Sequence, residues 1–186
     1  MTRRLLSLAL IAVAALALSA CGSRVDTVTR GESEADYVTL GKLQYQVQLS
    51  RQLNPASVAD RDLLVGLSPL DAVLKPDEVW FGVWIRVYNK SGQPQDSAEE
   101  FKVVDTRGRE YLPTAVDQVN RLIYRPGSVP DQGRLPLPGS AADGTPTSGA
   151  LLLFKLPVGT LDFRPLEFAF SQAAGDKNES TVRLDV

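Results

Sequence analysis

Apolar and polar residues alternate repeatedly after residue 36, and this pattern predicts a series of β-strands. Within 42–50, Leu43, Tyr45, Val47 and Leu49 alternate with glutamines, as in a strand with one face on a core and one in water. The uncharged glutamines (Gln44, Gln46 and Gln48) could also face another strand or a ligand. Further strands are predicted at 101–105, 109–113, 149–156, 165–171 and 181–186.

The densest apolar stretch is 78–89, which reads EVWFGVWIRVYN. One face carries β-branched residues and phenylalanine, which predicts a central strand on the core. The other face carries Trp80, Trp84, Arg86 and Tyr88, and two interpretations of it stay open. A loop covers this face, as in strands buried on both sides, or the face is exposed and stacks on sugar rings or an aromatic partner.

A long irregular segment, 114–148, contains five of the twelve prolines of the chain. Loops of this length inside compact domains are usually functional or disordered. The segment includes Leu122-Ile123-Tyr124 and Leu135-Pro136-Leu137, which are apolar enough to pack. We therefore expect it to lie over Trp80 and Trp84 and to bury them.

Shorter elements are predicted from local signals. Asn54-Pro55 is a typical helix start, which predicts a helical turn to about Arg61. Residues 63–67 are apolar and predict a short strand. Residues 105–108 end in glycine and predict the turn of a hairpin.

The N-terminus has the pattern of an export signal. Arg3 and Arg4 precede an apolar run, 5–18, that is too short for a spanning helix of about 20 residues. Leu18-Ser19-Ala20-Cys21 follows and resembles the lipobox of bacterial lipoproteins. The resemblance implies a signal peptide at 1–20 and a diacylglyceryl group on Cys21, which places the protein on a membrane. The alternative is an ordinary secretory signal with a chance cysteine.

Cys21 is the only cysteine, so an internal disulfide is excluded. A stable anchor requires two acyl chains, and a diacylglyceryl cysteine supplies both. Residues 22–36 are polar, so we expect 21–36 to form a flexible tether that precedes a domain over 37–186. Alternatively, part of 22–36 adds an edge strand to that domain.

Composition excludes several function classes. The chain has no histidine, and its one methionine is the first residue. A Ser-His-Asp triad, histidine-ligated zinc and methionine-rich copper sites are therefore excluded, and we expect no metal or cofactor. Without Arg3 and Arg4, Lys plus Arg falls from 20 to 18 against 22 Asp plus Glu, a formal charge of −4. An acidic domain lacks the basic face that nucleic acid needs.

Carboxylates are the main acid–base groups that remain. Asp60 with Asp62, or Glu99 with Glu100, could cleave a glycoside as a pair. Neighbouring residues on a strand point to opposite faces, however, which argues against an enzyme. Clustered carboxylates of the loop 93–100 could bind calcium, but EF-hand spacing is absent and a solvated loop is the simpler interpretation.

Seven or eight short strands with little helical periodicity predict an antiparallel, immunoglobulin-like β-sandwich, which is an all-β fold. Over 37–186 the chain resembles the Ig-like domains of unknown function in bacterial cell-surface lipoproteins. The segments that carry the resemblance are 86–92, the hairpin 101–113 and the strand 149–157. The family offers no agreed activity and no catalytic residues, and the insertion 114–148 departs from its shorter pattern.

We therefore expect a lipid-anchored, extracytoplasmic and non-catalytic binding module of the cell envelope. Its partners would be the membrane, through Cys21, and envelope proteins or polysaccharide, through Trp80, Trp84, Arg86 and Tyr88 if these are exposed. A structural spacer without a ligand and a carboxylate-dependent glycan hydrolase are the alternatives.

Overall fold

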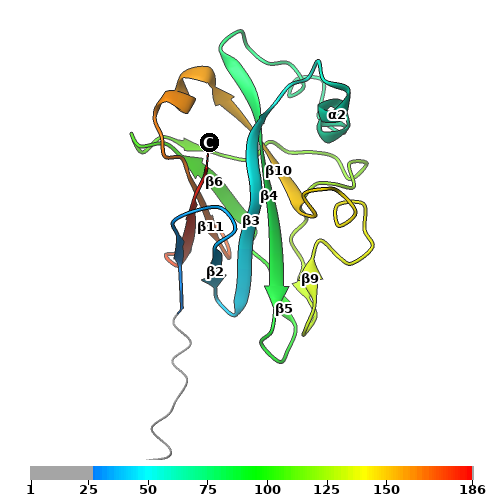
Figure 1. Ribbon diagram of the computed structural model, residues 1–186, viewed down its shortest axis with the longest axis vertical. Coiled ribbons are helices and arrows are strands. Elements are labelled where there is room, and N and C mark those ends of the chain that lie inside the picture. Colours follow the sequence, from blue (N-terminus) through cyan, green and yellow to red (C-terminus); the bar gives the residue numbers. More distant parts are fainter. Residues whose placement is uncertain (1–26, 186) are drawn as a thin grey trace, which may run out of the picture.

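The computed structural model describes residues 27–185, so the predicted signal peptide and Cys21 lie outside it. The described chain forms an all-β sandwich with one short α-helix (Figure 1). None of its described helices is long and apolar enough to cross a membrane.

The larger layer, called here the long sheet, is built around the two longest strands. These are β3 (Leu43–Leu53) and β4 (Glu78–Asn89), which run antiparallel along the length of the molecule (Figure 1). The order is β10-β4-β3-β2, with β9 paired to the end of β4. The remaining strands are β2 (Tyr37–Leu40), β9 (Arg134–Leu135) and β10 (Ala150–Pro157).

The second layer, called here the short sheet, has the order β1-β12-β11-β6-β7. Its strands are β1 (Arg30–Gly31), β6 (Glu100–Val104), β7 (Glu110–Tyr111), β11 (Glu167–Ser171) and β12 (Glu179–Arg183). A separate pair joins β5 (Gln95–Asp96) and β8 (Ser128–Val129).

The main core lies between the inner faces of the two sheets. The inner face of β4 contributes Phe81, Val83, Ile85 and Val87, as its alternation predicts. Opposite it, the rings of Phe101 and Phe168 stack with their centroids 5.7 Å apart. Strands β6, β10, β11 and β12 also place expected apolar residues in this core, and β3 does so with Leu43, Tyr45 and Val47. The alternating pattern is confirmed for these residues, but it is wrong for Leu49, because a register shift after Val47 places Leu49 in the cluster on the outer face.

The predicted tether is wrong at its C-terminal end. Arg30 and Gly31 form β1, which pairs in parallel with β12. Two backbone amides, of Glu32 and Ser33, donate to the Asp36 carboxylate at 2.9 and 3.0 Å. The domain therefore begins before residue 37, and the alternative of an added edge strand describes these residues.

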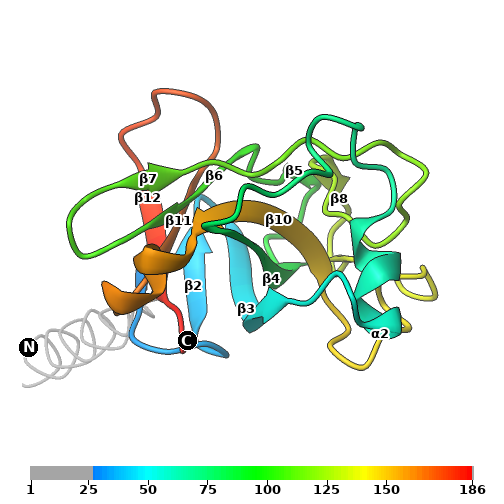
Figure 2. The ribbon, with the colours of Figure 1, turned by 90° about the horizontal axis from the view of Figure 1, so that it is seen from above.

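Two local predictions between β3 and β4 are corrected. Residues 63–67 do not form a strand: Asp62–Leu64 is a 3₁₀ helix, and Leu67 makes a single bridge to Val116. The α-helix α2 (Val58–Arg61) begins after Ser57, because Asn54 closes a turn by accepting the Ala56 amide at 3.0 Å. In Figure 2, α2 lies on the side of the molecule away from β7 and β12.

Candidate functional site

The outer face of the long sheet is divided into an apolar and a polar half. A register shift between Val47 and Leu49 marks the boundary on β3. Beyond it, Leu49 lies opposite Trp84 and Leu53 lies opposite Trp80 on β4. Before it, glutamines lie opposite Arg86 and Tyr88.

The apolar half is covered by two segments. Leu63, Leu64, Leu67 and Leu74 come from the connection between β3 and β4, and Val116, Leu122 and Ile123 come from the loop after β7. Trp80 and Trp84 are 1% and 3% exposed. The covered interpretation is confirmed for both tryptophans, and the exposed stacking surface is wrong for them.

The covering segments are joined to each other by buried hydrogen bonds. Asn120 donates its side-chain amide to the carbonyls of Leu63 and Val65, at 2.9 Å each. Only residues 116–123 of the predicted 114–148 loop contribute to this cluster, so the loop buries the tryptophans together with the β3–β4 connection.

The polar half is called here the open face. Two rows cross the long sheet in register: Tyr37, Gln46 and Arg86 form one, and Thr39, Gln44, Tyr88 and Arg134 form the other. Gln48 continues the glutamine row on β3. All of these side chains are half-buried or exposed, as expected of residues that stand on a sheet without a covering layer.

Two tyrosines form the aromatic part of the open face. The rings of Tyr37 and Tyr88 lie 5.7 Å apart at an interplanar angle of 58°. Tyr37 is 50% exposed. Partial burial and the adjacent phenol of Tyr88 raise the pKa of Tyr37, so Tyr37 stays a neutral hydroxyl at physiological pH. The pair offers ring faces together with hydroxyl donors and acceptors.

Two of the three glutamines, Gln46 and Gln48, are held by hydrogen bonds. Gln48 donates to the side-chain carbonyl of Gln46 at 2.6 Å, and Gln46 donates to the Ala35 carbonyl at 2.7 Å. Ordering these amides in the free protein reduces the side-chain entropy that would be lost when a ligand binds.

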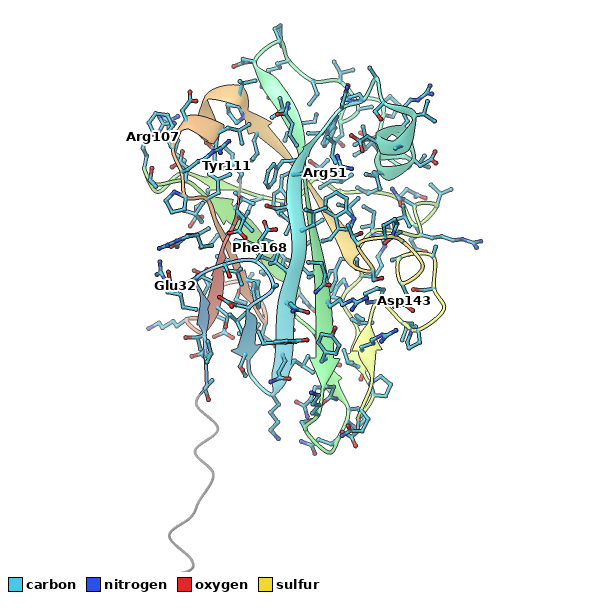
Figure 3. All side chains as sticks on the ribbon, viewed as in Figure 1. Glu32, Arg51, Arg107, Tyr111, Asp143 and Phe168 are labelled. Carbon is cyan, nitrogen blue, oxygen red and sulfur yellow. The ribbon has the colours of Figure 1, made fainter. Side chains whose placement is uncertain are left out.

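The segment 131–148 borders the open face and positions its arginines. Arg134 donates to both Asp143 oxygens, at 2.9 and 3.1 Å, and Arg86 donates to the Ser148 carbonyl. The Gly139 amide, followed by the Arg134 guanidinium, lowers the pKa of Asp143. Figure 3 shows Asp143 on this loop, at the edge of the long sheet near β9.

The structure therefore separates the four residues proposed for binding. Arg86 and Tyr88 lie on the open face, and the two tryptophans lie in the covered half. Sequence reasoning did not identify Tyr37 and Arg134, because they belong to short strands on either side of β3 and β4. The signal in the sequence that could have located the open face is the alternation of glutamines on 42–50. Polar side chains on one face of a strand indicate a face that is not packed against a core.

The carboxylates considered for catalysis lie elsewhere. Asp60 is buried and accepts two hydrogen bonds from Arg51, at 2.6 and 3.1 Å, while Asp62 is exposed. The Arg51 hydrogen bonds lower the pKa of Asp60. Within residues 27–185, no three Cys, Asp or Glu side chains gather as a metal site would require.

Comparison with known proteins finds a solved structure that shares the fold. No protein-family model matches the chain, and no curated protein matches it. The crystal structure of the YjhA protein of Bacillus subtilis has a TM-score of 0.54 and 12% identity, and covers 83% of this chain and 99% of that one. A likeness at this identity shows a shared fold.

Two further structures have lower scores. One is a Bacillus subtilis strain 168 protein named "putative lipoprotein (ycdA)", with TM-score 0.49 and 12% identity over 83% of this chain and 39% of that one. The other is an uncharacterised β-sandwich protein of Clostridium difficile 630, with TM-score 0.42 and 10% identity over 82% and 93%.

Proposed function

We propose that the protein is a lipid-anchored, non-catalytic binding module of the bacterial envelope, and that its ligand binds the open face. One observation carries this proposal. Two segments cover one half of the outer face of the long sheet, whereas the other half carries two tyrosines, three glutamines and two arginines that are half-buried or exposed. Tyrosine and arginine are enriched in binding surfaces. The tyrosines and arginines of the open face stand on sheet strands, which hold binding residues more precisely than loops do.

The proposal places the domain in an Ig-like family of cell-surface lipoproteins. Strand order supports this assignment. The order β3-β4-β10 corresponds to strands A, B and E of an Ig domain, and β12-β11-β6-β7 corresponds to G, F, C and an added C′. The chain also changes sheets at the connections where an Ig domain does, between B and C and between E and F.

The anchor proposal rests on Arg3, Arg4, the apolar run 5–18 and the Leu18–Cys21 sequence. Cys21 precedes Thr27, the first described residue, by six positions. Six residues span at most about 20 Å, at about 3.3–3.6 Å each. An acylated Cys21 would therefore keep the domain, with its open face, close to the membrane.

Sedimentation with envelope fragments tests the binding role. The full-length gene product is purified in mild detergent and mixed with envelope fragments of the bacterium that encodes it. Tyr37→Ala with Gln44→Ala should weaken co-sedimentation at least about tenfold, because central aromatic contacts dominate binding energies.

The matched control is Leu112→Ala with Gln118→Ala, at exposed positions outside the open face. Thermal unfolding checks that both double variants are folded. Equal retention of the wild type and the open-face variant would contradict the proposal and favour a spacer without a ligand.

A further inference from the structure

A cavity continues the open face beyond Tyr88. It has a volume of about 220 Å³ and lies between the end of β4 and the segment 131–148. Its lining includes Tyr88 and Lys90 on one side and Gln132, Arg134 and Pro138 on the other. This volume is below the range of about 300–1,000 Å³ for drug-sized ligands, so the cavity fits one small group of a larger molecule.

Buried hydrogen bonds fix the walls of this cavity. Asn89 is 1% exposed and donates its side-chain amide to the carbonyls of Gln93 and Val129, at 2.8 Å each. The Asn89 backbone amide donates to the Gly133 carbonyl at 3.0 Å. These bonds hold the two sides of the cavity at a constant separation, so the cavity exists before a ligand arrives.

The charge at the cavity is positive, although the whole chain carries a formal −2. Within residues 27–185, Lys90 has no carboxylate oxygen within 4.0 Å, whereas Arg134 is paired with Asp143. The neighbouring Asp131 accepts from the Gly92 amide at 2.9 Å and from Gln132 at 3.1 Å. The lining therefore carries two cationic side chains, Lys90 and Arg134, and no carboxylate, because Asp131 and Asp143 lie outside it.

We infer that this cavity binds the anionic group of an acidic polysaccharide whose neighbouring sugars lie on the open face. Lys90 and Arg134 are donors suited to a carboxylate or phosphate. Tyr37 and Tyr88 offer ring faces to sugars, and the glutamines offer amides to hydroxyl groups. The row from Thr39 to Arg134 crosses four strands, about 14 Å at 4.7–4.9 Å per strand, so it is long enough for an oligomer.

The inference rests on the proposed function, because it names the ligand class of the same face. Its test uses polygalacturonate and fully methyl-esterified polygalacturonate, which have the same backbone with and without charge. Binding to the purified full-length gene product is measured by calorimetry at low and high salt. We expect binding of the acid form, weakened by salt, and at least tenfold weaker binding of the ester.

Lys90→Gln should weaken polygalacturonate binding about three- to tenfold, since an exposed ion pair contributes up to about 1 kcal/mol and more where partly enclosed. Tyr37→Ala should weaken it as well. Lys177→Gln is the charge-matched control, because Lys177 is an exposed lysine that does not line this cavity, and it should leave binding unchanged.

Equal binding of acid and ester, lost in Tyr37→Ala, would overturn the anionic inference and leave the binding role of the open face intact. Glycerophosphoglycerol and polygalacturonate are also compared as competitors of the retention of the protein on envelope fragments. Competition by glycerophosphoglycerol but not by polygalacturonate would overturn the inference, since it identifies a lipid headgroup as the ligand. If neither polymer binds while the double variant Tyr37→Ala with Gln44→Ala still lowers retention on envelope fragments, the inference fails and the proposed function stands.

Discussion

At the residue scale, two buried tyrosines bind the backbone of one core residue, Ala98. The Ala98 amide donates to the Tyr45 hydroxyl at 2.7 Å, and the Tyr124 hydroxyl donates to the Ala98 carbonyl at 2.9 Å. Ala98 is fully buried. A buried amide or carbonyl without a partner is costly, so the two hydroxyls satisfy the N–H and the C=O of a residue that lies outside the regular strands.

Removing these hydroxyls should destabilise the domain unequally. Tyr45→Phe should lower the free energy of unfolding by about 1–3 kcal/mol, because it leaves a buried N–H without its acceptor. Tyr124→Phe should cost less, since a carbonyl oxygen is more readily left under-satisfied than an N–H. Urea unfolding measures both, and Tyr37→Phe on the exposed ring is the control. A larger loss for Tyr37→Phe than for Tyr45→Phe would refute this account.

The same tyrosines predict a loss of stability at alkaline pH. Burial raises the pKa of Tyr45 and of Tyr124 above the ordinary value of about 10. A raised folded pKa contributes stability that is complete below the unfolded pKa and is lost as pH rises through the folded value. Above about pH 10, each tyrosine should therefore lower stability by up to about 1.4 kcal/mol per pH unit.

Denaturant titrations between pH 9 and pH 11 measure this slope. In the Tyr45→Phe and Tyr124→Phe double variant, the slope should be smaller than in the wild type. An unchanged slope would show that other groups control the alkaline transition.

At the element scale, β4 is buried on both faces for half its length, and a glycine permits this. A Cβ built on Gly82 would lie 2.8 Å from the Trp84 ring and 3.1 Å from a Leu151 methyl carbon. The Trp84 ring therefore lies over Gly82, under the segments that cover it. A larger residue at this position would separate the ring from the sheet.

Gly82→Ala should lower stability by about 1–3 kcal/mol, the usual range for overpacking, and should shift tryptophan fluorescence to longer wavelength. Gly159→Ala is the matched control, because a Cβ there meets nothing within 4 Å. Thermal unfolding and emission spectra check both variants. If the two glycine variants unfold alike, close packing of Trp84 on Gly82 does not stabilise the face.

Strand periodicity made most of the fold predictable, since alternation on β3, β4, β6, β10, β11 and β12 reports which face meets a core. The two-residue strands β1 and β9 could not be predicted in this way. Arg30-Gly31 carries no alternation, and its place is set by pairing with β12, whose partner residues lie 151 positions later in the chain. The same reason explains why only part of the open face could be predicted. Its residues on the long strands, Gln44, Gln46, Arg86 and Tyr88, follow the alternation. Tyr37 and Arg134 lie on short strands and join them only through tertiary structure.

At the scale of the whole molecule, the anchor and the open face are separate predictions. The lipobox-like sequence predicts that Cys21→Ala removes the acyl modification, because no other cysteine is present. Intact mass should then lack a diacylglyceryl group, and the mass of the wild-type protein should correspond to a chain that begins at Cys21. A wild-type product with an unmodified Cys21 would contradict the lipoprotein assignment.

Tyrosine nitration in intact cells tests most directly whether the open face is occupied in the envelope. Tyr37 is half exposed, Tyr111 on the short sheet is a half-buried reference, and Tyr45 and Tyr124 are buried. Mass spectrometry compares the nitration of each residue in purified protein and in cells. The account predicts that Tyr37 reacts in the purified protein and is protected in cells, while the nitration of Tyr111 is unchanged. Equal nitration of Tyr37 in both settings would show that nothing occupies the open face and would contradict the account.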